Sequence, residues 1–270
     1  MELELLAREV SRIVEKTGAY IRREAQSFSP EAIQVKGLHD LVSYVDKEAE
    51  KQLVQGLSTL LPEAGFITEE ETIAQEEQPY TWIIDPLDGT SNFAHGIPIY
   101  SISVALRRES ALVLGVVYAI EQGECFIAWE GGGCYCNARR VQVSSSTQLD
   151  NTLLATGFPF RKFDHLQSYM GLLQELMQQS RGIRRLGSAA MDLAYVACGR
   201  FDAFFEYNLQ DYDIAAGIVL VREAGGQVFD FKGGDQMLEQ GSILAGNAHI
   251  TQTLLHRIGN HFVHFGHHTL

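Results

Sequence analysis

The chain is short of cysteines, of basic residues and of long apolar runs, and each shortage excludes a class of protein. Its four cysteines are too few for the disulfide framework of a secreted domain. Cys134 and Cys136 also stand closer together than the ligand pairs of zinc sites. No apolar run approaches the length of a membrane span, and the first residues lack the pattern of a signal peptide. We therefore expect a cytoplasmic protein with reduced thiols and no membrane partner.

Basic residues are outnumbered, since 21 lysines and arginines stand against 34 aspartates and glutamates, for a formal net charge of −13. A surface of this sign repels nucleic acids and anionic membranes, so neither is an expected partner. A phosphorylated substrate would need a local reversal of the negative charge. A bound divalent cation would supply that reversal.

Three well-known functional motifs are missing. The sequence has no Gly-x₄-Gly-Lys-Ser/Thr nucleotide-binding loop and no Gly-x-Ser-x-Gly nucleophile elbow. It also lacks the Asp-x-Asp-x-Asp-Gly pattern of a calcium loop, which argues against structural Ca²⁺ sites. No repeat, low-complexity tract or long linker interrupts the chain, so we expect one compact unit of two halves, 1–146 and 147–270.

Apolar periodicity predicts two helices and then strands in the first half. Leucine, isoleucine and valine recur at helical spacing over 3–24 and again near 42–60, where Pro62 stops the second helix. Two short strands follow, and then three runs of strand composition, over 99–107, 111–119 and 123–129, have polar or glycine-containing turns between them, which is typical of an antiparallel meander. The predicted strands cover 64–68, 80–85, 99–107, 111–119 and 123–129.

The second half alternates between the two kinds of element. Strands are predicted at 152–155, 182–186, 201–207, 227–231 and 242–245, and helices at 164–179, 188–198, 213–224 and 248–258. Helices layered against sheets in both halves predict a mixed α/β or α+β sandwich. The last residues, 259–270, contain four histidines, and we expect a frayed, solvated terminus rather than a metal-binding tail.

The most informative segment is Trp82-Ile83-Ile84-Asp85-Pro86-Leu87-Asp88-Gly89-Thr90-Ser91-Asn92-Phe93, in which an apolar strand runs into a turn. Two carboxylates that stand three residues apart on a turn, here Asp85 and Asp88, can converge on one hard cation. The Leu87 carbonyl lies between them and adds a third oxygen. The segment therefore has the composition of an oxygen-ligand site.

The end of the same segment suits an anion. Gly89 leaves room for a ligand, and Thr90 adds a hydroxyl near a predicted helical turn whose free N–H groups suit a phosphate. A plain turn that closes the strand is the alternative, because Asp, Pro and Gly are ordinary turn residues.

Acidic residues gather at the ends of three predicted elements. Glu69-Glu70-Glu71 follows one strand, Asp85 and Asp88 end the next, and Asp211-Tyr212-Asp213 opens an apolar helix. Taken singly, such residues are solvated loops, turns or helix N-caps. Together they resemble the set of carboxylates and carbonyls that Mg²⁺ needs, with a substrate phosphate completing its shell.

These motifs, in this order, resemble the inositol monophosphatase family, the lithium-sensitive, magnesium-dependent phosphatases. The segment 82–93 matches the family's first signature nearly residue for residue. The second signature is matched by Asp213-Ile214-Ala215-Ala216-Gly217 and its continuation Glu223-Ala224-Gly225-Gly226. Further matches are Asp40–Asp46, Phe66–Glu70, Gly131–Ser144 and Gly187–Ala190, so the resemblance covers roughly residues 5–258.

The resemblance implies a layered αβαβα sandwich with two or three Mg²⁺ ions at one site. The implied metal ligands are Glu69, Asp85, Asp88, Asp213 and the Leu87 carbonyl. Thr90 and Glu69 would position the attacking water and help to deprotonate it, and Asp46 would orient the Thr90 hydroxyl.

The family's substrate contacts carry over in the same way. The phosphate would rest on the amides of Gly89 and Thr90, and Glu206 would contact a substrate hydroxyl. The 187–190 loop would frame a sugar or cyclitol pocket, and the implied contacts there and opposite it are Ser188, Ala189 and Asp213.

The resemblance therefore implies a homodimeric, lithium-sensitive phosphatase that hydrolyses inositol 1-phosphate or a similar small polyol or sugar phosphate. Fold and metal chemistry leave other substrates open, namely fructose 1,6-bisphosphate, 3′-phosphoadenosine 5′-phosphate, NADP and histidinol phosphate. Basic residues that could read a second phosphate are few: Arg161, Lys162, Arg184 and Arg185. A regulatory protein with little turnover is the alternative from a different class.

The chain departs from the family pattern on the substrate side. Tyr212 stands where many relatives have Trp, and Gln210 replaces a frequent His. The first change keeps an aromatic wall, whereas the second puts the identity of the substrate in doubt rather than the chemistry. Lys36 is either the family's basic residue near the site or a surface lysine, since its spacing to Asp40 is one residue short.

Overall fold

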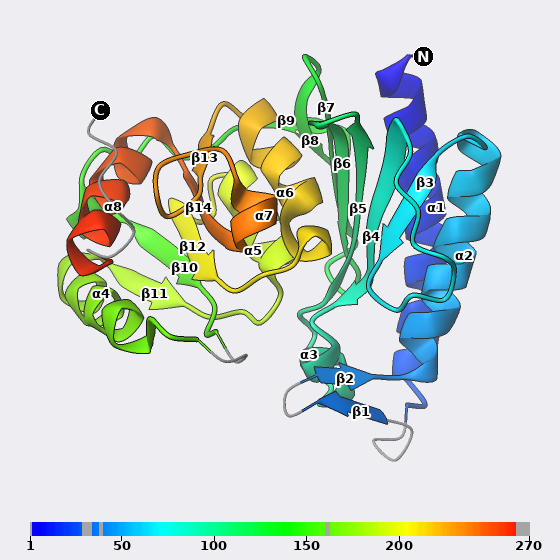
Figure 1. The fold of residues 1–270 in the computed structure, drawn as a ribbon, viewed down its shortest axis with the longest axis horizontal. Helices are drawn as coiled ribbons and strands as arrows, with labels where there is room; N and C mark the ends of the chain where they lie inside the picture. Colours follow the sequence, from blue (N-terminus) through cyan, green and yellow to red (C-terminus); the bar gives the residue numbers. More distant parts are fainter. Residues whose placement is uncertain (1, 29–33, 38–39, 160–162, 263–270) are drawn as a thin grey trace.

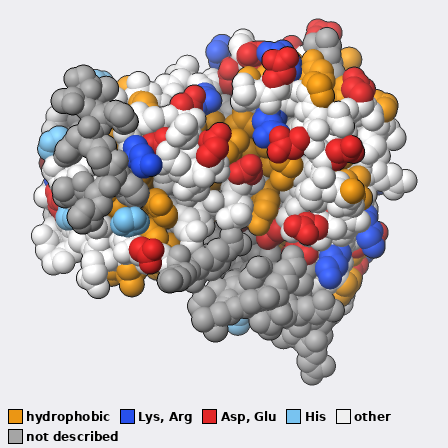
Figure 2. Space-filling view, viewed as in Figure 1, with side chains coloured by type: hydrophobic (Ala, Val, Ile, Leu, Met, Phe, Trp, Pro, Cys, Tyr) orange, Lys and Arg blue, Asp and Glu red, His pale blue; other side chains and the backbone are white. Residues whose placement is uncertain are grey.

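The computed structural model describes residues 2–28, 34–37, 40–159 and 163–262, and of 34–37 and 40–42 it describes only the backbone (Figure 1). The predictions for Arg161 and Lys162, for the side chain of Lys36 and for most of the histidine-rich end lie outside this part of the chain. On the face in Figure 2, acidic side chains lie over both halves of the molecule and Lys and Arg are dispersed among them.

Five layers follow one another across the molecule (Figure 1). Helices α1 (Leu3–Ala25) and α2 (Tyr44–Leu60) cover the outer face of a seven-stranded sheet, and α5 (Ala189–Ala197) and α6 (Asp211–Glu223) cover its inner face. A five-stranded sheet packs on the other side of α5 and α6, and α4 (Leu166–Gln179) and α8 (Ala248–His261) close the stack. The predicted αβαβα sandwich is confirmed.

The first sheet has the order β3-β4-β5-β6-β7-β8-β9. Only β3 and β4 pair in parallel, and all other neighbours are antiparallel, with β5, β6 and β7 forming the predicted antiparallel meander. The strands are β3 Gly65–Thr68, β4 Tyr80–Asp88, β5 Ser101–Arg108, β6 Ala111–Ala119, β7 Glu124–Trp129, β8 Gly133–Cys136 and β9 Arg139–Val141. Sequence analysis missed β8 and β9, because both are short and rich in glycine, cysteine and arginine.

The second sheet is mixed, with the order β11-β10-β12-β14-β13. Strand β10 pairs in parallel with both of its neighbours, β11 and β12, whereas β14 runs antiparallel to both of its neighbours. The strands are β10 Leu153–Thr156, β11 Gly182–Arg184, β12 Ala203–Tyr207, β13 Gln227–Phe229 and β14 Ser242–Gly246. Residues 142–152 join the two sheets and contain the expected boundary, but the division into two halves stays a prediction.

Small residues bring α6 close to the first sheet. Eight of the helix's residues are buried, among them Ala215 and Ala216, as expected for a helix between two sheets. Gly115 of β6 faces this helix, and a Cβ there would lie 2.5 Å from the Ala216 carbonyl oxygen. At the start of α6, Ser103 of β5 donates a hydrogen bond of 3.2 Å to the Tyr212 carbonyl oxygen. The position of the helix on the sheet is therefore fixed at two points.

Five short elements were not assigned from the sequence with these bounds. They are β1 Gln34–Gly37, β2 Asp40–Val42, α3 Thr90–Ala94, a 3₁₀ turn Leu149–Asn151 and α7 Met237–Gln240. Of these only α3 was anticipated, as the helical turn after the 82–93 motif. In the described residues, no helix is both long enough and apolar enough to cross a membrane.

Candidate active site

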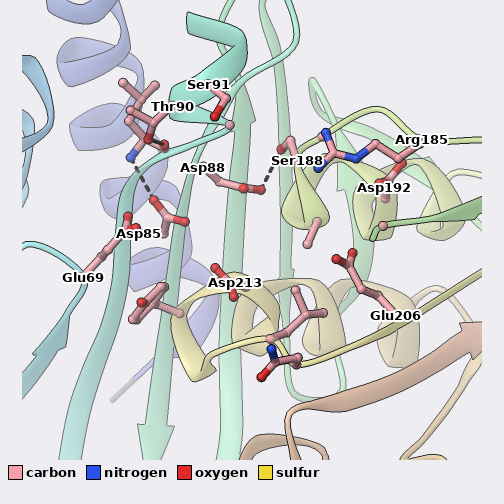
Figure 3. A pocket seen from close by; sticks show the side chains of 18 residues that line it. Glu69, Asp85, Asp88, Thr90, Ser91, Arg185, Ser188, Asp192, Glu206 and Asp213 are labelled. Carbon is pink, nitrogen blue, oxygen red and sulfur yellow. Dashed lines mark hydrogen bonds between the residues drawn. The ribbon is translucent and has the colours of Figure 1, made fainter. Parts of the chain in front are cut away.

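A pocket opens where the C-terminal end of β4 meets the N-termini of α5 and α6 (Figure 3). Its walls come from both halves of the chain and contain nearly every residue predicted for the site. The lining residues are Glu69, Asp85, Leu87, Asp88, Gly89, Thr90, Ser91, Gly157, Arg185, Gly187, Ser188, Ala189, Asp192, Glu206, Asn208, Leu209, Tyr212 and Asp213. Of the predicted catalytic residues only Asp46 lies behind the wall, in contact with Thr90.

A bulge in β4 brings the two motif aspartates to the same side of the strand. Residues three apart in a regular strand point to opposite faces. Here Asp85 pairs with Ser103 and Asp88 pairs with Ser101, so β4 has one residue more than its partner over this stretch. Pro86, which has no N–H group, lies within the bulge. The Leu87 N–H donates a hydrogen bond of 2.9 Å to Asp85 Oδ1 and closes the turn.

Asp88 is held by the start of α5. The Ser188 hydroxyl donates to Asp88 Oδ2 at 2.6 Å, and the Ala190 N–H donates to the same oxygen at 2.8 Å. Burial raises the pKa of Asp88 to about 6, although these two bonds and the charge of Arg185 act to lower it. Ser188 therefore lies in the predicted place, but its hydroxyl is occupied by Asp88.

Glu69 and Asp85 lie next to each other on one side of the pocket, and Asp213 lies on α6 nearby (Figure 3). Burial raises the pKa of Glu69 well above its usual range, and the negative charge of Asp213 raises it further. Burial and then the charge of Glu69 do the same to Asp85. Glu69 Oε2 is buried and has no hydrogen-bond partner in the described residues. Burial and neighbouring negative charge therefore disfavour the ionised forms of these carboxylates, and a cation among them would offset that cost.

The donor set fits Mg²⁺ by its chemistry. Hard carboxylate oxygens and one backbone carbonyl, supplied by strand β4, the loop after β3 and helix α6, are the ligands that this ion prefers. In the described residues, no three His, Cys, Asp or Glu side chains are already gathered closely enough to hold an ion. The fit therefore rests on the kind and charge of the donors, and the side chains would have to draw together around an ion.

Thr90 and Asp46 are in contact, as predicted. The Thr90 hydroxyl lies 3.1 Å from Asp46 Oδ1 and 3.0 Å from the Leu87 carbonyl oxygen, so its proton has two acceptors. Asp46 is itself fixed at the start of α2, because its Oδ2 accepts hydrogen bonds from the Ser43 N–H at 2.9 Å and the Ser43 hydroxyl at 2.5 Å. Gly89 has φ +95°, which a glycine adopts without strain.

The loop that carries Glu69 is clamped by Glu50, which the sequence analysis did not single out. Glu50 is fully buried on α2, one helical turn after Asp46. Its carboxylate accepts hydrogen bonds from the Glu70 N–H at 2.8 Å, the Thr72 N–H at 2.7 Å and the Thr72 hydroxyl at 2.6 Å. One face of α2 thus supports both Thr90 and the loop at 69–72.

The far end of the pocket is also charged. Burial raises the pKa of Glu206 to about 8, and the charge of Asp213 adds to that rise. The Glu206 carboxylate lies against the backbone of Gly157, where a Cβ would come within 1.9 Å of Oε1. Arg185 is the only cationic residue among the described lining residues. Its guanidinium lies 5.9 Å from the centre of the Phe158 ring.

Four lining residues, Gly157, Asp192, Asn208 and Leu209, were missed by sequence analysis. For Asp192 a signal existed, since it is the single charged residue in the otherwise apolar helix α5. The two departures from the family pattern lie at the site as well. Tyr212 lines the pocket, and Gln210 is the N-cap residue of α6, with its N–H donating to Asp213 Oδ2 at 2.6 Å.

Comparison with known proteins places the chain in a family. Residues 3–262 match the model of the inositol monophosphatase family. An inositol-1-monophosphatase of Mesorhizobium japonicum is 42% identical over 89% of this chain and 91% of its own. A protein named Nus factor SuhB from Pseudomonas aeruginosa is 41% identical over 93% and 94% of the two chains.

A solved structure gives the same answer for the fold. The extragenic suppressor protein suhB of Bartonella henselae superposes with a TM-score of 0.89 at 40% identity, over 94% of this chain and 98% of its own. The chain therefore belongs to the inositol monophosphatase family, and the resemblance seen in its motifs is confirmed. It is a phosphatase of the phosphoric monoester hydrolase type.

Proposed function

We propose that this phosphatase hydrolyses inositol 1-phosphate, or a similar small polyol phosphate, to the alcohol and inorganic phosphate in a Mg²⁺-dependent reaction. The observation that carries the proposal is the convergence of Glu69, Asp85, Asp88 and Asp213 on one pocket that also contains Thr90. When bound, Mg²⁺ supplies Lewis acidity and offsets the negative charge of the phosphate. Two or three ions per site are proposed, held by these carboxylates and the Leu87 carbonyl.

The attacking water is oriented by side chains in the wall. Thr90 accepts a hydrogen bond from the water while its own proton is donated to Asp46, and the distance of 3.1 Å supports this relay. Glu69 takes up the proton that the water loses, and its buried Oε2, which has no hydrogen-bond partner in the described residues, supports this role. The amides of Gly89 and Thr90 hold the phosphate at the start of α3.

The substrate body lies toward the second half of the chain. Glu206 accepts a hydrogen bond from a substrate hydroxyl, and Ala189 and Asp213 line the same space. Because the Ser188 hydroxyl is engaged with Asp88, Ser188 contributes mainly by holding that carboxylate in place.

The charge of the pocket favours a monophosphate. Arg185 is one cation against two acidic residues, Asp192 and Glu206, among the described residues at the far end. A second phosphate there would find one cation, Arg185, beside two buried acidic groups, which disfavours fructose 1,6-bisphosphate, 3′-phosphoadenosine 5′-phosphate and NADP. Histidinol phosphate, whose body is cationic, remains the strongest competing substrate.

Phosphate release from a panel of substrates tests the proposal. Inositol 1-phosphate, histidinol phosphate, fructose 1,6-bisphosphate, 3′-phosphoadenosine 5′-phosphate and NADP would each be assayed with Mg²⁺ and with a chelator. We expect the highest kcat/KM for inositol 1-phosphate and no release with the chelator. A higher kcat/KM for another ester would support the phosphatase reaction but replace inositol 1-phosphate as the proposed substrate.

The second candidate is a regulatory protein with little turnover, and the name Nus factor of the P. aeruginosa relative favours it. All predicted metal ligands and Thr90 are present, however, which favours catalysis. Absence of release from every ester would support the regulatory function. We further propose a cytoplasmic homodimer that lithium inhibits, and light scattering coupled to size-exclusion chromatography would test the dimer.

A further inference from the structure

Asp192, in the first turn of helix α5, is the single charged residue of that helix. The helix α5 lies between the two sheets, and its other residues are apolar. Asp192 is 1% exposed, and its Oδ1 is buried without a hydrogen-bond partner in the described residues. A buried carboxylate in this state costs stability, so its presence points to a function.

Asp192 lies at the end of the pocket that receives the substrate body. It lines the pocket with Arg185 and Glu206, across from Glu69 and Asp85 (Figure 3). The negative charge of Glu206 raises the pKa of Asp192, after burial, and the positive charge of Arg185 lowers it.

The side chains of Arg185, Asp192 and Glu206 do not form ion pairs with one another. Within the described residues, Arg185 makes no ion pair with Asp192 or Glu206 within 4.0 Å. The carboxylates of Asp192 and Glu206 therefore remain available as acceptors, and the guanidinium remains available as a donor.

We propose that Asp192 is a specificity-determining residue that accepts a hydrogen bond from a second hydroxyl of the substrate body, beside the hydroxyl bound by Glu206. This inference rests on the proposed polyol phosphatase activity. A polyol supplies hydroxyl protons to both carboxylates, whereas a body without hydroxyls leaves both of them buried and unpaired. Sites built to bind a hydroxyl discriminate strongly against analogues that lack it.

The test compares two substrates in the full-length protein with Mg²⁺. Inositol 1-phosphate has hydroxyls beside the ester, and p-nitrophenyl phosphate has none. Asp192→Leu keeps the approximate shape and removes the acceptor. We expect kcat/KM for inositol 1-phosphate to fall about tenfold or more, mainly through KM, with less than about a twofold change for p-nitrophenyl phosphate.

A binding measurement gives a readout that does not depend on turnover. Calorimetric titration of Asp192→Leu would use a phosphonate analogue of inositol 1-phosphate, in which CH₂ replaces the bridging ester oxygen. The affinity of the variant for this analogue should fall by about the same factor as its kcat/KM. Methylphosphonate should bind equally to the variant and to the wild type. The melting temperature of Asp192→Leu should not fall, because the substitution removes an unpaired buried carboxylate from an apolar helix.

Met191→Leu is the matched control, since Met191 is buried on the same helix and does not line the pocket. Asp192→Asn keeps one acceptor oxygen, so its kcat/KM for inositol 1-phosphate should fall less than that of Asp192→Leu. If the leucine variant does not fold, the asparagine variant takes its place in the test. An equal fall in kcat/KM on both substrates, or unchanged kinetics on inositol 1-phosphate, would overturn the role of Asp192 but not the proposed phosphatase activity. A wild type without preference for a hydroxyl-bearing ester would overturn the proposed function as well.

Discussion

The clamp formed by Glu50 predicts that a buried residue outside the pocket controls affinity for Mg²⁺. Glu50 Oε1 accepts from both the N–H and the hydroxyl of Thr72, and Oε2 accepts from the Glu70 N–H. In Glu50→Gln the amide oxygen can keep the Thr72 donors, but the NH₂ group then faces the Glu70 N–H. The hydrogen bond from the Glu70 N–H is lost, and the two hydrogen bonds from Thr72 are weakened because their acceptor is no longer charged.

The magnitude follows from these bonds. A hydrogen bond to a charged group contributes about 1.5–3 kcal/mol, so we take a loss of about 2–3 kcal/mol for the loop at 69–72. If all of this appears as disorder of the loop that carries Glu69, the affinity for Mg²⁺ falls roughly 30- to 150-fold. Saturating Mg²⁺ should restore most of kcat, because the pocket residues themselves are unchanged.

The assay combines calorimetric titration of Mg²⁺ with hydrogen exchange at the Glu70 and Thr72 amides, which should lose protection. Glu48→Gln is the matched control, since Glu48 is exposed on the same helix and loses the same charge. The reasoning would be refuted if Glu50→Gln kept both the affinity for Mg²⁺ and the protection of the two amides.

Three further predictions concern the pocket itself. Asp85→Asn should lose Mg²⁺ binding and activity together, and Mg²⁺ should raise the melting temperature of the wild type but not of this variant; retained activity would remove Asp85 from the ligand set. Burial raises the pKa of Glu206 from 4.5 to about 8, so the folded chain holds a proton there that the unfolded chain has released. Stability without metal should therefore fall as pH rises from 4.5 to about 8, and chemical denaturation of Glu206→Gln should show a flatter dependence. In Gly157→Ala the added Cβ would fall 1.9 Å from Glu206 Oε1, so the carboxylate must shift, and KM for a polyol phosphate should rise while KM for p-nitrophenyl phosphate changes less.

Local patterns predicted most of the fold, and they predicted the pocket residues that belong to motifs. The strand and turn of 80–90 could be recognised because an apolar run meets Asp, Pro and Gly at fixed spacing. The bulge could not be predicted, because it depends on the pairing of β4 with β5. Yet this bulge is what places Asp85 and Asp88 on one side of the strand.

Residues whose role depends on a distant partner gave no such signal. Glu50 stands in a run of charged residues and looks like its exposed neighbour Glu48 until α2 packs beside the loop at 69–72. Asp192 differs, because one charge in an apolar helix can be seen in the sequence. Its place beside Glu206 depends on the packing of α5 against β12, which periodicity does not specify.

The close packing of α6 on the first sheet would also set the width of the proposed metal site. Asp85 and Asp88 belong to that sheet, whereas Asp213 belongs to α6, one helical turn before the Ala216 carbonyl that touches Gly115. The distance between α6 and the sheet would therefore also set the distance from Asp213 to Asp85 and Asp88. Mg²⁺ needs oxygens at about 2.0–2.1 Å and Ca²⁺ at about 2.3–2.6 Å. A methyl group on residue 115 would push α6 away from the sheet, and the changed separation of the carboxylates would alter the preference between the two ions.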